Sequence, residues 1–97
     1  MTEITVTSLE VRRKAGELKS LNRQLKQKIE QLEARETVLN SMWDGQARDA
    51  FHERFRKDKA KMILFYDAIE TYVAALLEIA SKYEKAEKKN LLILRGR

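Results

Sequence analysis

The chain has 97 residues, enough for one small domain, and a formal net charge of +5. It contains no cysteine and one histidine, which excludes disulfides, zinc–thiolate sites and a histidine metal site, so we expect no metal and no cofactor. Hydrophobic residues make up 43% and charged residues 36%, and proline is absent, which is typical of a charged, amphipathic helical protein.

The N-terminus MTEITVTS has neither the basic start nor the apolar run of a secretory signal peptide, so no cleavable signal is expected. The longest purely apolar run is Leu91–Leu94, far shorter than the roughly 20 residues that cross a bilayer. We therefore expect a soluble chain without a membrane span.

The first long segment predicts an amphipathic helix over about residues 8–41. Thr7, followed three residues later by Glu10, is typical of a capping box at its start. An apolar row repeats every seven residues and is narrow enough to suit packing against one neighbour. The row consists of Val11, Leu18, Leu25, Leu32 and Leu39.

Residues 42–46 predict a bend. Gly45 can adopt φ > 0 where the chain reverses, at no steric cost. Ser41 or Asp44 is expected to accept hydrogen bonds from amides at the start of the next helix. Trp43 ends the first helix, where its ring either packs on the hairpin core or stands out as an anchor for a partner. The residues alone leave both possibilities open.

The second long segment predicts a helix over about residues 47–90 and a C-terminal tail over residues 91–97. Its apolar row advances in steps of three and four and supplies core or dimer contacts. These contacts are expected from Phe51, Phe55, Met62, Phe65, Ile69 and Leu76. Asp58 interrupts the row and is expected to pair with a base such as Lys28, because an unpaired buried carboxylate is costly.

A second apolar set widens the arc of this helix beyond what one partner helix can hide. The set consists of Tyr66, Val73, Leu77 and Ala80. Because the connection is short, the helices are expected to be antiparallel neighbours. The sequence therefore predicts an all-α fold, a two-helix hairpin forming a single domain over residues 1–97. A lone hairpin would leave the second set in water, so dimerisation into a four-helix bundle is the simplest way to bury these side chains.

Trp43-Asp44-Gly45, followed by Ala47 and Phe51, lies in the middle of a two-helix chain of about a hundred residues. This arrangement resembles the WXG family of small Trp-Xaa-Gly proteins. Members are virulence-associated substrates of the type VII (ESX) secretion system of Gram-positive and mycobacterial cells. The resemblance implies an export signal Tyr-Xaa-Xaa-Xaa-Asp/Glu, which Tyr83 and Glu87 match one helical turn apart.

The resemblance also implies a route. The chain would be made in the cytoplasm, pair with itself as a homodimer or with a related hairpin, and be secreted folded through a channel driven by an FtsK/SpoIIIE-type ATPase. The membrane is then only the secretion route. Trp43 of one subunit would lie close to the C-terminal signal of its partner. Because this chain is basic where members are usually acidic, an acidic hairpin or the N-terminal domain of a larger toxin is an alternative partner. An effector role and an escort role both stay open.

Other function classes fit parts of the sequence less well. A basic helical dimer that binds nucleic acid would use the cluster Arg54, Arg56, Lys57, Lys59 and Lys61, but few aromatic residues lie among these charges. An intracellular coiled-coil adaptor would leave Trp43, Gly45, Tyr83 and Glu87 without a role. We expect no enzyme, no catalytic residue and no small-molecule substrate, since a glycine-rich phosphate loop is missing and His52 is expected to point to solvent.

Overall fold

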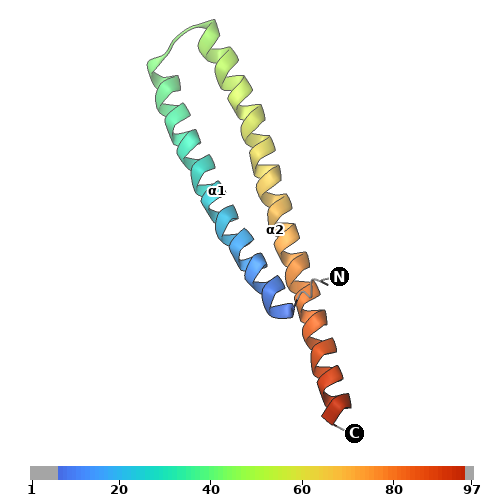
Figure 1. The fold of residues 1–97 in the computed structure, drawn as a ribbon. Helices are drawn as coiled ribbons and strands as arrows, with labels where there is room; N and C mark the ends of the chain where they lie inside the picture. Colours follow the sequence, from blue (N-terminus) through green and yellow to red (C-terminus); the bar gives the residue numbers. More distant parts are fainter. Residues whose placement is uncertain (1–6, 96–97) are drawn as a thin grey trace, which may run out of the picture.

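The structure is a hairpin of two long antiparallel helices (Figure 1). The computed structural model describes residues 7–95, with only the backbone described for residues 92–95. Helix α1 spans Ser8–Met42, helix α2 spans Gln46–Arg95, and residues 43–45 join them. The molecule measures 79 × 27 × 15 Å and is therefore a rod. The fold is all-α, as the sequence predicted, and the described residues contain no strand.

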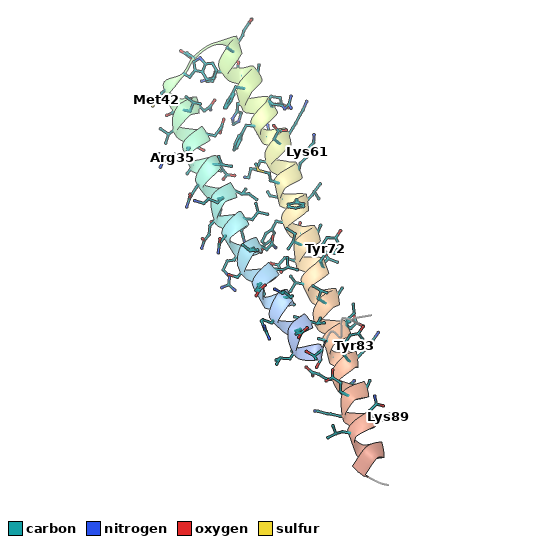
Figure 2. All side chains as sticks on the ribbon, viewed as in Figure 1. Arg35, Met42, Lys61, Tyr72, Tyr83 and Lys89 are labelled. Atoms are coloured by element: carbon teal, nitrogen blue, oxygen red, sulfur yellow. The ribbon has the colours of Figure 1, made fainter. Side chains whose placement is uncertain are left out.

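Helix α2 is longer than the sequence predicted. A tail was expected from residue 91, whereas the backbone stays helical to Arg95 because residues 46–95 contain no glycine and no proline. The last turns of α2, which include Lys89, project beyond the start of α1 (Figures 1 and 2). Residues 96–97 of the predicted tail, like residues 1–6, lie outside the described residues. Within the described part of the chain, neither helix contains a stretch long and apolar enough to cross a membrane.

Helix α1 begins at the predicted cap. Thr7 has extended backbone, and its hydroxyl oxygen accepts a hydrogen bond from the backbone N–H of Glu10 at 3.2 Å. The carbonyl of Thr7 accepts a second bond from the N–H of Val11 at 3.1 Å. The first bond satisfies an N–H that the helix itself leaves unpaired at its first turn, and the second is the first backbone bond of the helix.

The chain reverses at Gly45, whose φ of 104° confirms the role predicted for this glycine. The expected side-chain cap of α2 is not formed. The hydroxyl of Ser41 instead donates to the carbonyl of Val38 at 2.6 Å, and the carboxylate of Asp44 lies 3.7 Å from the guanidinium of Arg48. Both polar groups therefore have partners other than the amides at the start of α2.

A narrow seam runs between the helices and is built from every seventh residue. On α1 the buried row is Ser8, Ala15, Asn22, Ile29 and Glu36. On α2 the facing row is His52, Lys59, Tyr66, Val73, Ala80 and Glu87. We call these two rows the hairpin seam. Apart from the large apolar Ile29, most of its side chains are small or paired: Ala15 and Ala80 are fully buried, and the Asn22 amide donates to the Tyr66 carbonyl at 3.1 Å. Such a seam brings the helices close together but buries little apolar surface.

The large apolar side chains lie beside the hairpin seam and stay partly exposed. On α1, each of these residues comes three positions after a seam residue. On α2, each comes one or four positions before a seam residue. Because the helices are antiparallel, these positions lie on the same side of the hairpin. We call this side the apolar face. It consists of Leu18, Leu25, Leu32, Leu39, Phe51, Phe55, Met62, Phe65, Ile69, Tyr72, Leu76 and Ile79. Leu32 is 49% exposed and Phe65 is 59% exposed.

The two apolar sets of α2 are therefore divided between the hairpin seam and the outside differently from the sequence-based expectation. Val73 and Ala80, which were expected to be covered by a second hairpin, are buried within one chain in the hairpin seam at 3% and 0% exposure. The physical reason is size. The small side chains of Ala15 and Ala80 let the two helices approach closely there, and most of the bulky rows lie to one side.

Ion pairs close the other side of the hairpin seam. Arg12 donates two hydrogen bonds to Glu84, with 3.1 Å between Nη2 and Oε2, and Lys59 pairs with Glu33. The hydrogen bond from Arg12 lowers the pKa of Glu84, and the same bond raises the pKa of Arg12. The hairpin thus has one polar, internally paired side and one apolar side.

Candidate functional site

The predicted bend motif lies at one end of the rod. Trp43 follows the last residue of α1 with extended backbone and is 36% exposed. Its ring lies against Phe51, with ring centroids 5.8 Å apart and planes inclined by 52°. Tilted aromatic pairs of this kind are attractive beyond their area of contact. Part of the Trp43 ring thus packs on α2 and part remains exposed at the bend, and its role as an anchor for a partner stays a prediction.

The predicted export signal lies near the other end of the rod, beside the start of α1. Tyr83 is 46% exposed. The carboxylate of Glu87 accepts hydrogen bonds from the backbone N–H of Ser8 at 3.2 Å and from the Ser8 hydroxyl at 3.0 Å. A carboxylate is stabilised there because the first amides of a helix carry partial positive charge. The sequence reasoning missed Ser8, although its seven-residue spacing from Ala15 and Asn22 marks a seam position.

One chain does not bring the two motifs together. Met42, next to the bend, and Tyr83 lie far apart along the rod (Figure 2). Helix α2 alone separates Gln46 from Tyr83 by about 55 Å at 1.5 Å per residue. A surface that contains both Trp43 and Tyr83 therefore requires a second hairpin, packed antiparallel to the first.

The basic cluster of α2 does not form a continuous stripe of unpaired cations. Arg54 lies 3.2 Å from the carboxylate of Asp58 on the same helix, and Lys59 is paired with Glu33 across the hairpin seam. The first pair also corrects an expectation, since Asp58 binds Arg54 and not a base on α1. Because Arg54 and Lys59 are already paired with carboxylates, the cluster offers a phosphate backbone fewer free cations than its sequence indicated.

His52 contacts α1 while 40% of its side chain stays exposed, so the expectation that it only points to solvent is corrected in part. Its Nδ1 lies 2.6 Å from Oε1 of Glu36, which is only 7% exposed. The two residues come from opposite sides of the bend, and a pairing of this kind cannot be read from the periodicity of either helix alone. The described residues contain no group of three or more histidine, aspartate or glutamate side chains placed to hold a metal ion.

These features define a small all-α hairpin with a Trp-Xaa-Gly bend between its helices. The sequence matches the WXG100 family, proteins of 100 residues with WXG, over residues 3–88. The chain therefore belongs to the WXG100 family, which confirms the resemblance drawn from Trp43 and Gly45. Among curated proteins, none matches the chain by sequence.

Solved structures of EsxB, a secreted protein from Bacillus anthracis str. Sterne, have a similar fold. Selenomethionine-labelled EsxB has a TM-score of 0.79 and 28% identity, over 90% of this chain and 99% of EsxB. Wild-type EsxB in space group P21 has a TM-score of 0.76 and 29% identity, over 86% of this chain and 89% of EsxB. The likeness extends over nearly the whole of both hairpins.

Proposed function

We propose that this chain is a non-enzymatic helical-hairpin protein exported by a type VII (ESX-like) secretion system. The observation that carries the proposal is the exposure of Trp43 at the bend and of Tyr83 at the far end of a WXG100 hairpin. The similar EsxB of Bacillus anthracis is a secreted protein, which supports the same destination for this chain. Export of this kind needs no cleavable signal peptide.

The hairpin travels as one half of a pair. Covering the apolar face with a second hairpin forms a four-helix bundle and removes large side chains from water. In an antiparallel pair, Trp43 of one hairpin lies beside the Tyr83–Glu87 turn of the other, so an FtsK/SpoIIIE-type ATPase can recognise both. The partner is a second copy, a related hairpin or the helical N-terminal domain of a larger secreted toxin. The chain accordingly acts as an effector or as an escort.

Export in a Gram-positive host that carries a type VII system tests the proposal. The wild-type chain should reach the medium in this host and stay in the cells of a strain that lacks the secretion ATPase. Trp43→Ala and Tyr83→Ala should each retain most of the protein in the cells, because each removes an exposed aromatic ring of the recognition surface.

Leu64→Ala is the matched control. Leu64 is 67% exposed on α2, outside both motifs and outside the apolar face, so its loss removes apolar surface without touching the recognition surface. This variant should be exported like the wild-type chain. Export that persists without the ATPase, or that falls equally with Leu64→Ala, contradicts the proposal.

A further inference from the structure

The apolar face is too large and too bulky to remain in water. Along its length, Leu32 is 49% exposed, Phe65 59% and Tyr72 63%. A continuous apolar surface of this kind on a soluble chain marks a docking site for another protein. The charges at its border then decide which proteins can dock.

Cations border the apolar face along α1. Arg35 lines the same groove as Leu39 and Phe55, and Lys28 lies seven residues earlier on the same side of the helix. Lys14 lines a second groove at the open end of the hairpin, but this groove also contains Glu10, and Lys14 is paired with Glu17 at 3.2 Å. In the described part of the chain, neither Lys28 nor Arg35 forms an ion pair. Both charges are therefore available to a partner.

A second copy of this chain offers these cations little compensation. The carboxylate in the α2 rows of the face belongs to Asp58, which Arg54 already neutralises at 3.2 Å. Each copy would also add a net charge of +5. Bringing Lys28 and Arg35 into an interface without opposing carboxylates costs desolvation energy that no ion pair returns.

From this arrangement we infer that the apolar face docks an acidic helical hairpin, whose carboxylates lie opposite Lys28 and Arg35, in preference to a second copy of the chain. The guanidinium of Arg35 is well suited to such a partner because its planar fork binds a carboxylate through two parallel hydrogen bonds. The inference rests on the proposed function for the pairing of hairpins and adds the chemistry of the partner.

A charge-reversed copy of the chain provides the probe. The variant Lys28→Glu/Arg35→Glu keeps the apolar face and replaces its cations by carboxylates, in residues that are exposed and in a helix that tolerates glutamate. Mixed with the wild-type chain at low salt, it should form a two-chain species about tenfold more tightly than the wild-type chain alone, as measured by light scattering over a concentration series. High salt should remove most of this advantage.

Two further variants make the result specific. Arg23→Glu/Lys57→Glu reverses the same amount of charge outside the apolar face and should give a much smaller gain. The neutral variant Lys28→Gln/Arg35→Gln should be intermediate, and circular dichroism should show equal helicity for all chains. An equal gain from the Arg23/Lys57 variant would assign the effect to net charge and overturn the inference.

A wild-type chain that forms a tight, salt-insensitive dimer by itself would also overturn the inference, because a second copy would then cover the face. That result would leave the proposed export intact, since export is measured separately in the host. Absence of association in every mixture would contradict both the inference and the pairing step of the proposed function.

Discussion

Ser8 and Glu87, which are 79 positions apart in the sequence, close the open end of the hairpin through two hydrogen bonds. The Glu87 carboxylate accepts one bond from the Ser8 backbone at 3.2 Å and one from the Ser8 hydroxyl at 3.0 Å. Glu87 thus belongs to the candidate export signal on α2 and also holds the first turn of α1. A loss of export in a Glu87 variant would therefore have two possible causes, and Ser8 separates them.

Ser8→Ala and Glu87→Ala should each lower the free energy of unfolding by about 0.5–1 kcal/mol, because each weakens the same contact at the start of α1. Urea denaturation at one fixed protein concentration measures this change. Only Glu87→Ala should also reduce export, since Ser8→Ala leaves the Tyr83–Glu87 turn chemically unchanged. Equal export defects in the two variants would show that Glu87 acts through the fold and not through recognition.

Alanine substitutions at two glycines should change stability in opposite directions. A Cβ at Gly45 or at Gly16 would meet no atom within 4 Å, so steric contact is not a factor at either site. Gly45→Ala should lower the free energy of unfolding by about 1–2 kcal/mol, because a φ of 104° is strained for an L-residue. Gly16→Ala, inside α1, should raise it by about 0.5–1 kcal/mol. Thermal unfolding of both variants tests the pair, and shifts of the same sign would contradict the assigned backbone roles.

The His52–Glu36 contact should respond asymmetrically to the loss of either partner. His52→Ala leaves the 7% exposed Glu36 without its hydrogen-bond donor and should cost about 1–3 kcal/mol. Glu36→Leu should cost less, because the His52 side chain is 40% exposed and water can solvate it. The double variant His52→Ala/Glu36→Leu should recover most of the loss, as a double-mutant cycle in urea would show. Additive losses would mean that the two residues are not coupled.

The Arg12–Glu84 pair predicts that the hairpin weakens in acid. Arg12 holds the pKa of Glu84 below its usual range in the folded chain, whereas the unfolded chain has the ordinary value of about 4.3. The stabilisation is therefore complete above the unfolded-state pKa and is lost as the pH falls through the folded-state pKa. The urea midpoint should be measured from neutral pH down to pH values below the ordinary pKa. As the pH falls, this midpoint should decrease less steeply for Glu84→Gln than for the wild-type chain.

Glu53→Gln is the control for this pH series, because it removes an exposed carboxylate of α2 that has no described ion pair. It should behave like the wild-type chain through the acid range. Identical slopes for Glu84→Gln and the wild-type chain would exclude a contribution of the Arg12–Glu84 pair to acid sensitivity.

Much of the site could be predicted because it depends on short motifs. Trp43 and Gly45 lie at the bend, and Tyr83 and Glu87 lie one turn apart on α2, as their spacing indicated. The contacts that restrain these residues could not be predicted in the same way. Ser8 reaches Glu87 only after the whole hairpin has closed, so nothing near either residue in the sequence points to the other.

By itself, the sequence determined two long helices and the place where the chain reverses. Local physics is sufficient for this: proline-free segments with a regular apolar period favour helix, and Gly45 accepts the φ of a turn. Only the tertiary structure decided how each helix is rotated about its axis. A helix with a wide apolar arc can pack against its neighbour through more than one of its rows. Contacts between residues that are distant in the sequence decide which row faces the neighbour. Here Ser8–Glu87 and Glu36–His52 turn the small and polar rows inward, which leaves the large apolar rows on the outside for a partner.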